Sequence, residues 1–545
     1  MADFKENVKI WKEKVKDGAL RAELDALKDE TALKDRFYKD LEFGTGGLRG
    51  ILGVGTNCLN IYTVARASEG IAAYMRAHGM KKIAVSYDSR INSELFAETA
   101  ARAFAAAGLK TVIVKELMPT PFLSFLTREE KCDMGVMITA SHNPAQYNGY
   151  KVYNAEGCQI VDAAAKEISS YIEKTPYFGA EAQPFENYLA AGAIVYAGDG
   201  VEEKYLSGVK DIVKAAPSPL KVTYTALNGT GYRIIPKLLR TAVAEVKLVK
   251  EQCVPDGNFP TCPYPNPEKS EALALGLQEA KKNQSDILLA TDPDADRVGV
   301  AVKTENGYTL LTGNEVGVLL TDYLLSDLKR RNLPTDRAVI VKTIVTTSLA
   351  ELVAKKYDAS VINVLTGFKY IGEQIGLLEK RGEADRFLLG FEESYGYLLG
   401  TQVRDKDAVV AVLAVCKAAA HYLAAGKTLV DRLNEIYAEY GRFYHKLLTF
   451  EFPGAAGREH IEKTMKELRG DCGSFLGRKV IKAANYLQTE KTGLPRSNVL
   501  ALEFADGAGV VIRPSGTEPL LKVYVTSRGA EDTALYAALS DFFKA

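Results

Sequence analysis

The sequence of 545 residues lacks an excess of either charge. Lysine and arginine total 69, and aspartate and glutamate also total 69. Proteins that bind nucleic acid or anionic membranes usually carry a basic excess, so the balance gives no support for either partner. Hydrophobic residues make up 47% and charged residues 25%, which is typical of globular domains. At about 100–200 residues per domain, the length predicts several domains.

The sequence also lacks a C-x-x-C motif and a long apolar run. Its seven cysteines are scattered and odd in number, which indicates free thiols in a reducing compartment. The segment MADFKENVKIWKEKVKDG is too charged for a signal peptide. The most apolar stretch, residues 408–420, is interrupted by Lys417 and indicates a buried helix, not a membrane span. We therefore expect a cytoplasmic protein.

Two common functional motifs are missing as well. The segment FGTGGLRG carries Arg49 where the dinucleotide-binding motif G-x-G-x-x-G needs its third glycine, and no clear strand precedes it. Ser141, in TASHNP, does not lie in a G-x-S-x-G motif. Its neighbour His142 should point elsewhere, because adjacent side chains usually diverge. A serine-hydrolase site is therefore disfavoured.

The chain instead alternates apolar strands with alanine-rich helices. After a helical segment at about residues 3–40, stretches such as KIAVSYD, SDILLATD and VIVKTIVT each lie near a helical pattern. This alternation predicts α/β domains with mainly parallel sheets. The last hundred residues, with strands and glycine turns, predict a smaller α+β domain. The predicted domains are residues 1–200, 201–311, 312–440 and 441–545.

The strongest functional signal is ILLATDPDADRVGV, in which an apolar strand precedes three alternate aspartates. Side chains two apart in an extended segment point the same way, so Asp292, Asp294 and Asp296 can converge. Neighbouring carboxylates repel unless a cation neutralises them, and oxygen ligands suit Mg²⁺. Arg297 and Lys303 exclude an EF-hand, because they replace its glycine and glutamate. A Mg-dependent phosphatase with an aspartate nucleophile is the chemical alternative.

Two further loops can bind a phosphorylated sugar. In GVVIRPSGTEP, Arg513 can bind a phosphate through two parallel hydrogen bonds. A Gly-Pro hairpin turn would explain this loop's proline and glycine, but not its arginine beside two hydroxyls. In GFEESYGY, residues 390–397, carboxylates and a serine can bind sugar hydroxyls. An acidic helix N-terminus explains that stretch about equally well.

In this order, TASHNP, DPDADR, GFEES and RPSGTEP resemble the motifs of the α-D-phosphohexomutase superfamily, in its phosphoglucomutase/phosphomannomutase branch. The resemblance implies an α/β protein with four domains around a central cleft. Three would be α/β sandwich domains of shared topology, and the fourth a smaller, mobile α+β domain. The four domains would carry, in chain order, a phosphoserine loop, a metal-binding loop, a sugar-binding loop and a phosphate-binding loop.

The resemblance also implies a role for each matching residue. Ser141 would be the phosphoserine, and its phosphate would hold one Mg²⁺ together with Asp292, Asp294 and Asp296. Lys406 would act as general acid or base only if its pKa were depressed, and the acids beside it argue against a large depression. The other catalytic matches are Arg49, His142, Lys151 and Arg297. The substrate-binding matches are Thr366, Gly367, Phe368, Glu392, Ser394, Arg513, Ser515, Gly516 and Thr517.

The implied reaction interconverts glucose 1-phosphate and glucose 6-phosphate, with glucose 1,6-bisphosphate as intermediate and activator. The sugar loop lacks the histidine of the phosphomannomutase motif G-E-M-S-G-H, which favours glucose phosphates. Phosphomannomutase, phosphopentomutase and glucose-1,6-bisphosphate synthase activities stay open, as does a non-catalytic sugar-phosphate sensor. A sensor, however, has no use for Ser141 and the metal site. The expected partners are small sugar phosphates, and the sequence does not predict the oligomeric state.

Overall fold

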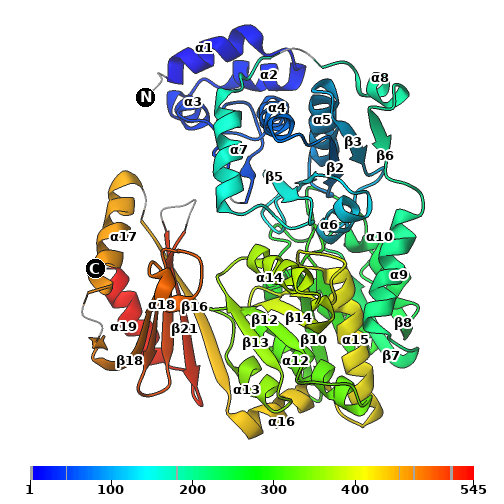
Figure 1. Ribbon diagram of the computed structural model, residues 1–545, viewed down its shortest axis with the longest axis vertical. Coiled ribbons are helices and arrows are strands. Elements are labelled where there is room, and N and C mark those ends of the chain that lie inside the picture. The colour runs from blue at the N-terminus through cyan, green and yellow to red at the C-terminus, as the bar shows by residue number, and fades with distance from the viewer. Residues whose placement is uncertain are drawn as a thin grey trace.

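The computed structural model describes residues 4–44, 46–179, 182–452, 454–470, 473–515 and 520–544. Their strands form four sheets, one in each of four domains arranged along the chain (Figure 1). Three sheets contain helices between parallel strands, and the fourth is antiparallel throughout. This arrangement confirms the predicted fold class.

The first three sheets share one four-stranded unit. In each unit the first strand lies between the second and the third, all three are parallel, and the fourth pairs antiparallel with the third. Helical crossovers join the parallel strands, as this topology requires. The shared topology that the family resemblance implied is therefore present in all three sheets.

The first domain extends its unit by one strand at each end, β1 beside β5 and β6 beside β3. Three N-terminal helices pack on this domain through Trp11, whose ring meets four other aromatic rings at 5.4–5.6 Å between centroids. The elements are α1 (Phe4–Lys14), α2 (Gly18–Ala26), α3 (Glu30–Phe37), β1 (Leu48–Ile51), α4 (Ile61–Ala77), β2 (Lys82–Tyr87), α5 (Ser93–Ala106), β3 (Lys110–Ile113), α6 (Thr120–Glu129), β4 (Met134–Ile138), β5 (Tyr147–Asn154), α7 (Asp162–Lys174), α8 (Phe185–Ala190) and β6 (Ile194–Tyr196).

The second domain adds one outer strand, β11, to its unit, and a long irregular segment connects β8 to the next helix. Its elements are α9 (Val201–Val213), β7 (Ser218–Thr225), α10 (Gly231–Leu239), β8 (Val243–Leu248), η1 (Ser270–Leu273), α11 (Ala274–Asn283), β9 (Ile287–Thr291), β10 (Val298–Thr304) and β11 (Gly307–Leu311).

The third domain consists of the unit alone with its helices. Its helix α15 is the predicted apolar helix, and it packs against β7, α9 and α10 of the second domain as well as against β15. The elements are α12 (Gly313–Arg330), β12 (Val339–Thr343), α13 (Leu349–Lys355), β13 (Ser360–Val364), α14 (Phe368–Lys380), η2 (Ala384–Arg386), β14 (Phe387–Glu392), β15 (Gly396–Leu398), α15 (Ala408–Ala424) and α16 (Leu429–Tyr440).

Within the described part of the chain, no single helix meets the length and apolarity needed to span a membrane. The pair α15 and α16, bent by 83°, meets those two criteria only when its helices are taken together.

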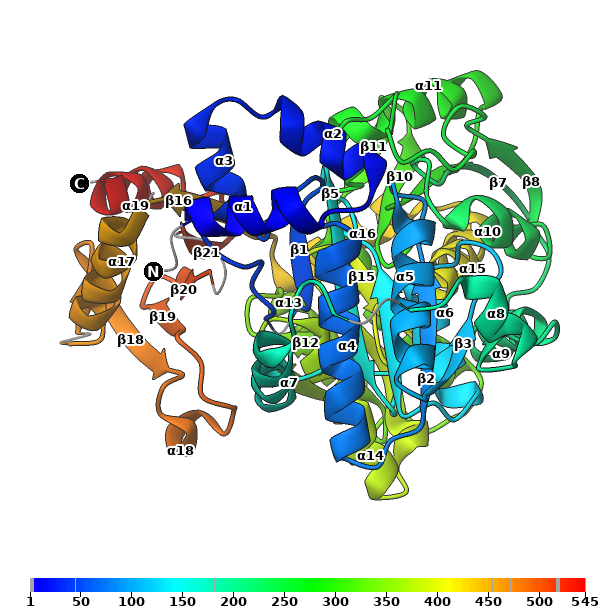
Figure 2. The same cartoon turned by 90° about the horizontal axis from the view of Figure 1, so that it is seen from above.

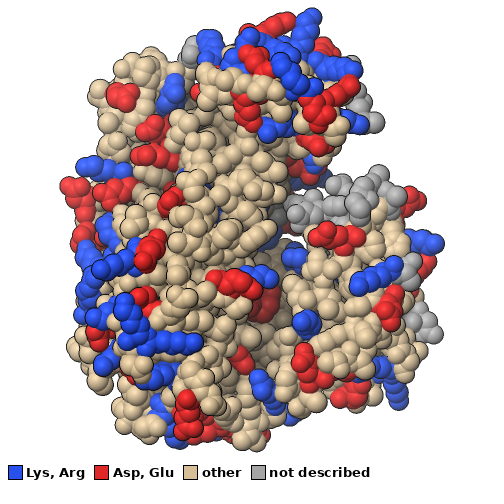
Figure 3. All heavy atoms as spheres, turned by 180° about the vertical axis from the view of Figure 1, so that it is seen from behind, with Lys and Arg blue, Asp and Glu red and all other residues tan. Residues whose placement is uncertain are grey.

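The fourth domain has an apolar core of its own, whereas one continuous apolar core runs through the first three. Figure 2 shows this domain beside the rest of the molecule, and Figure 3 shows a hollow between them on a surface of interspersed charges. Its elements are β16 (Phe443–Glu451), α17 (Gly454–Leu468), β17 (Ser474–Phe475), β18 (Arg478–Asn485), α18 (Thr489–Thr492), β19 (Leu500–Phe504), β20 (Gly509–Pro514), β21 (Leu520–Arg528) and α19 (Thr533–Lys544).

In each repeated unit, the loop after the first strand holds the loop after the third, because these strands are parallel neighbours. In the first domain, Arg90 donates to backbone carbonyls of the loop after β4. In the second, the Thr230 N–H donates to the Pro293 carbonyl at 2.8 Å. In the third, Thr346 Oγ1 donates to Glu393 Oε2 at 3.0 Å. The carboxyl ends of parallel strands are where α/β folds place their ligands.

Gly229 tests how tightly these paired loops pack. A Cβ at Gly229 would lie 2.3 Å from Pro293 Cα and 2.5 Å from its carbonyl oxygen, so Gly229→Ala must displace backbone. We expect this overpacking to lower the free energy of unfolding by about 1–3 kcal/mol in urea titrations.

The matched control is Gly200→Ala, because Gly200 is exposed and a Cβ added there would have no atom within 4 Å. It should stay within about 0.5 kcal/mol of the wild type. Equal stability of the Gly229 and Gly200 variants would contradict the tight contact between the two loops.

Candidate active site

Ser141 lies in a strained turn after β4, and its hydroxyl donates a hydrogen bond to an aspartate of the second domain. Its φ of 51° is in the left-handed region, which a residue with a side chain adopts only at a cost. Its amide donates to Thr139 Oγ1 at 2.8 Å, and its Oγ donates to Asp292 Oδ2 at 2.7 Å. The serine and the aspartate, 151 positions apart, therefore form one centre between two domains.

His142 lies closer to Ser141 than the sequence predicted. Its Nδ1 is 3.2 Å from Ser141 Oγ, because the left-handed turn at Ser141 brings the neighbouring side chains together. Burial, followed by the charges of Arg297 and Arg49, lowers the pKa of His142 well below its usual value. Among the described residues no carboxylate hydrogen-bonds to its other nitrogen, so the orienting acid of a hydrolase triad is absent there. The positive surroundings suit a phosphate on the serine.

The three predicted metal ligands are buried side by side. Asp292, Asp294 and Asp296 are at most 1% exposed, and each offers an oxygen within 4.8 Å of the others. Their convergence has a different cause from the one predicted: residues 292–297 form a turn, with Ala295 at φ 48°, and not an extended segment. The alternate spacing indicated the right residues, but the turn directs their side chains.

The aspartate cluster fits a divalent cation. The Oδ1 atoms of Asp294 and Asp296 are buried and have no hydrogen-bond partner among the described residues. Carboxylate oxygens without a hydrogen bond are costly to bury, and hard cations are their usual partners. Burial, together with the charges of Asp294 and Asp296, raises the pKa of Asp292 well above its ordinary value. The ionised form of Asp292 is therefore favoured by positive charge beside it.

Two lysines supply part of that charge. Lys151 Nζ lies 2.9 Å from Asp294 Oδ2, and Lys406 Nζ lies 3.1 Å from Asp296 Oδ2. Burial alone would lower the pKa of Lys406, but the carboxylates of Asp296, Asp405 and Glu392 outweigh it and raise the pKa. A general-base role would need a depressed pKa at Lys406, and this arrangement raises the pKa instead.

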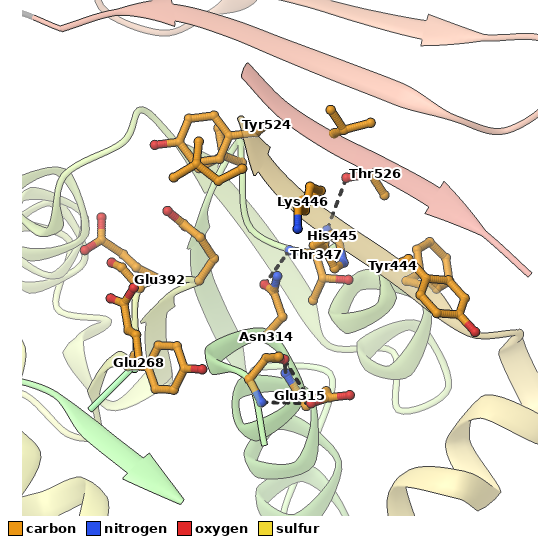
Figure 4. Close-up of a pocket in the computed structure, with 18 of the residues that line it drawn as sticks. Glu268, Asn314, Glu315, Thr347, Glu392, Tyr444, His445, Lys446, Tyr524 and Thr526 are labelled. Atoms are coloured by element: carbon orange, nitrogen blue, oxygen red, sulfur yellow. Dashed lines mark hydrogen bonds between the residues drawn. The ribbon is translucent and has the colours of Figure 1, made fainter. Parts of the chain in front are cut away.

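A pocket of about 670 Å³ beside this centre is lined by all four domains (Figure 4). Glu268 and Glu392 lie together on one side, whereas His445 and Lys446 come from β16 of the fourth domain. Its lining contains these predicted residues: His142, Arg297, Thr366, Gly367, Glu392, Ser394 and Arg513.

The predicted sugar loop contacts another predicted substrate-binding segment, residues 366–368, in this pocket. Glu392 Oε1 accepts a hydrogen bond from the Gly367 amide at 2.9 Å. Burial raises the pKa of Glu392 to about 7, although the charge of Lys406 opposes the shift. Thr366 Oγ1 is buried beside them without a hydrogen-bond partner among the described residues, so it can still bind a ligand hydroxyl.

Other predicted residues lie around the pocket or outside the described part of the chain. Arg49 is exposed on β1, and Phe368 is buried, with its ring 5.5 Å from Lys406 Nζ. Ser515 directly follows β20, two residues after Arg513. Gly516 and Thr517, predicted to complete the phosphate loop, lie outside the described residues.

Several contacts in the site carry no sequence signal. Glu268 pairs with Arg297 at 2.5 Å, and Thr120 Oγ1 donates to Asp294 Oδ2 at 2.8 Å. Glu393, whose neighbours Glu392 and Ser394 were predicted, accepts hydrogen bonds from Thr343 and Thr346. These contacts join segments far apart in the chain, so only the fold identifies them.

Models of the four domains of one family match the chain in order. The phosphoglucomutase/phosphomannomutase α/β/α domains I, II and III match residues 40–177, 203–307 and 312–440, and the C-terminal domain matches residues 465–539. The chain belongs to the phosphoglucomutase/phosphomannomutase family.

Curated relatives in this family cover nearly the whole chain. The phosphoglucomutase of Staphylococcus haemolyticus is 35% identical over 534 residues, covering 94% of this chain and 95% of the relative. That of Staphylococcus saprophyticus is 36% identical over 502 residues, covering 89% and 90%.

Solved structures share the fold at lower identity. A phosphomannomutase described as putative, from Thermus thermophilus, has a TM-score of 0.68 at 23% identity and covers 93% of this chain and 99% of its own. The open form of the Paramecium phosphoglucomutase parafusin has a TM-score of 0.69 at 18% identity, covering 92% and 94%. Both confirm the four-domain fold.

Asp292→Asn tests the aspartate cluster as a cation site. Because an amide removes one of three repelling charges and keeps the side chain's shape, we expect the metal-free variant to be at least as thermostable as the wild type. We also expect it to lose the rise in Tm that millimolar Mg²⁺ gives the wild type, since bound metal stabilises the folded state.

Asp336→Asn is the matched control, because Asp336 is exposed and distant from the cluster in sequence. It should keep the wild-type response to Mg²⁺ in differential scanning calorimetry. A Mg²⁺-dependent rise in Tm that survives in Asp292→Asn would show that the cation binds elsewhere.

Proposed function

We propose that this chain is a phosphoglucomutase that interconverts glucose 1-phosphate and glucose 6-phosphate through a phosphoserine at Ser141. The observation that carries the proposal is the 2.7 Å contact between Ser141 Oγ and Asp292, a member of the buried aspartate cluster. The Staphylococcus relatives named phosphoglucomutase, which match nearly the whole chain, support this choice of reaction. The domain divisions at residues 200, 311 and 440 are part of the same proposal.

Mg²⁺ is the proposed metal, held by Asp292, Asp294, Asp296 and the phosphate on Ser141. The all-oxygen ligand set and the two buried oxygens without a hydrogen bond support it. The N-acetylphosphoglucosamine mutase of Aspergillus fumigatus, which shares the fold at a TM-score of 0.52 and 15% identity, was solved with GlcNAc-6P and magnesium. When bound, the ion would neutralise negative charge on the phosphoryl group during transfer.

The reaction has two phosphoryl transfers, and together they return Ser141 to its phosphorylated form. In the first, the bond between phosphorus and Ser141 Oγ breaks, and a bond forms to the free hydroxyl oxygen of the sugar monophosphate. The proton of that hydroxyl ends on Ser141 Oγ, and the product is glucose 1,6-bisphosphate. In the second, the bond between the other phosphorus and its sugar oxygen breaks, and that phosphoryl group bonds to Ser141 Oγ. The Oγ proton ends on the released sugar oxygen. Positioning provides most of the catalysis in such transfers.

Residues on different sides of the pocket stabilise the transferring group, bind the sugar and bind the second phosphate. Lys151 and Lys406, fixed by the aspartates at 2.9 and 3.1 Å, place positive charge beside the transferring group. Glu392, with Ser394, binds the sugar hydroxyls. Arg513 and the loop after it bind the phosphate that does not react. One phosphate site on the fourth domain can serve both orientations of the bisphosphate.

The proposed location is the cytoplasm. The six described cysteines are free thiols, which is the usual state in a reducing compartment. Small-molecule sugar phosphates are the proposed partners, and glucose 1,6-bisphosphate is the proposed activator.

Ser141→Ala tests the proposal in an assay of glucose 1-phosphate conversion with Mg²⁺ and glucose 1,6-bisphosphate present. Because the variant has no oxygen to carry the phosphoryl group, we expect the rate to fall by roughly 1,000-fold or more. Ser170→Ala, at a half-buried serine of α7 whose hydroxyl donates to the Glu167 carbonyl of the same helix, should keep the wild-type rate.

Three results would favour another function. Near-normal mutase activity of Ser141→Ala would exclude the phosphoserine. Phosphate release that survives in Ser141→Ala and is lost in Asp292→Asn would indicate an aspartate-nucleophile phosphatase. A wild-type rate on mannose 1-phosphate or ribose 1-phosphate that exceeds the rate on glucose 1-phosphate would indicate a different sugar preference.

A further inference from the structure

We propose that Arg90 is the positioning residue that holds Ser141 in its reactive conformation, and that Phe259 of the second domain covers it. The inference rests on the proposed phosphoryl transfer at Ser141. Arg90 lies in the loop after β2, at the position in the repeated unit from which each domain holds its functional loop. It lies outside the sequence motifs that indicated the site.

The Arg90 guanidinium binds the serine loop through its backbone carbonyls. Its Nη2 and Nε donate to the Ser141 carbonyl at 2.7 and 3.2 Å, and Nη2 also donates to the Asn143 carbonyl. Its Nη1 donates to the carbonyls of Pro144 and Tyr147 at 3.0 and 2.8 Å. One planar group therefore fixes the path of the backbone from the serine to the start of β5.

The hydrogen bonds from Arg90 are needed because the backbone conformation of Ser141 is unfavourable by itself. A φ of 51° at a residue with a side chain persists only where the surroundings impose it. Carbonyls that turn into the protein interior must also find donors. Arg90 provides these donors at the strained residue, and Ser141 Oγ is thereby directed at Asp292.

Arg90 is itself fixed by a buried acid. Asp88 Oδ1 accepts hydrogen bonds from the Arg90 amide at 2.9 Å and from Ser93 Oγ at 2.7 Å. Asp88 Oδ2 lies 3.6 Å from Arg90 Nε, and both side chains are fully buried. The carboxylate balances the guanidinium charge, so an arginine can be kept there without solvent.

The second domain closes over this arrangement. The ring centroid of Phe259 lies 5.0 Å from Arg90 Cζ, and Phe259 is 1% exposed. The backbone of Gly257 packs so closely that a Cβ there would lie 2.4 Å from the Ile91 nitrogen. The same domain carries the aspartate cluster, so Phe259 links the position of the serine to the position of the metal ligands.

Arg90→Lys tests the proposal, because lysine keeps the charge but has one nitrogen with three donors where arginine has a planar fork. The serine loop should then move by about an ångström, which costs roughly 100-fold in rate when a reacting group is misplaced. We expect kcat to fall by that factor and the KM for glucose 1-phosphate to stay within about threefold. The rate at which glucose 1,6-bisphosphate phosphorylates Ser141, followed by intact mass, should fall with kcat.

Arg102→Lys is the matched control, since Arg102 also donates to two loop carbonyls of the first domain, those of Ala182 and Gln183. It should keep the wild-type kcat and phosphorylation rate. A folded Arg90→Lys protein with wild-type kcat would overturn the proposal. Wild-type protein that is not phosphorylated at Ser141 would instead refute the proposed function, so the two failures are distinguishable.

If Arg90→Lys does not fold, Phe259→Leu tests the positioning role of Arg90 instead. Leucine keeps an apolar cover but removes the aromatic ring face from the Arg90 guanidinium. The free energy of a buried cation–π contact corresponds to a factor of roughly 5 to 30 in a rate or equilibrium constant. We expect kcat and the phosphorylation rate to fall within that range, while KM stays unchanged and the protein remains folded. A folded Phe259→Leu protein with wild-type kcat would contradict the role of Phe259 and, beside an unfolded Arg90→Lys, would leave Arg90 a purely structural residue.

Discussion

The burial of three carboxylates within 4.8 Å of one another is the constraint on which the rest of the site depends. Such a cluster is unstable without positive charge or hydrogen-bond donors around it, and the structure provides both. Lys151 and Lys406 contact two of the aspartates, and Ser141 donates a hydrogen bond to the third. The buried Oδ1 atoms of Asp294 and Asp296, which accept no hydrogen bond from the described residues, are available to a cation. The serine and the lysines are therefore fixed by the same carboxylates that would bind the metal.

The repeated four-stranded unit explains how these groups meet. Each of the first three domains places a loop after its third strand at the carboxyl edge of its sheet, and each loop has a residue in the left-handed region: Ser141, Ala295 or Tyr395. The loop at this place in the unit thus carries Ser141 in the first domain, the three aspartates in the second and the predicted sugar loop in the third. The fourth domain has an apolar core of its own and meets the third domain through a small cluster of Leu365, Tyr486 and Val499. Arg513, the proposed phosphate-binding residue, therefore reaches the pocket from a domain with a separate core.

The sequence predicted the parts of the site that are local. Strand alternation predicted the α/β domains, and the spacing of Asp292, Asp294 and Asp296 predicted a metal site, although a turn and not an extended segment brings them together. Chain-wide motif order predicted the pairing of Ser141 with the aspartates, which no single segment could indicate.

The parts that escaped prediction depend on contacts across domains or with the backbone. Glu268 has a role only because Arg297 lies 2.5 Å away in the folded chain. Arg90 binds carbonyl groups, which every residue has, so its partners leave no pattern in the side chains of the serine loop. The closeness of His142 to Ser141 follows from a backbone angle that the residue types do not reveal.

The central claim is that phosphorylated Ser141 and the aspartate cluster bind one metal ion together. Electron–nuclear double resonance on protein phosphorylated at Ser141 and loaded with Mn²⁺ in place of Mg²⁺ measures this directly. The account predicts a phosphorus hyperfine coupling typical of a phosphate oxygen bound to the metal, and its loss when the serine is dephosphorylated. Tightly bound Mn²⁺ without phosphorus coupling would contradict it.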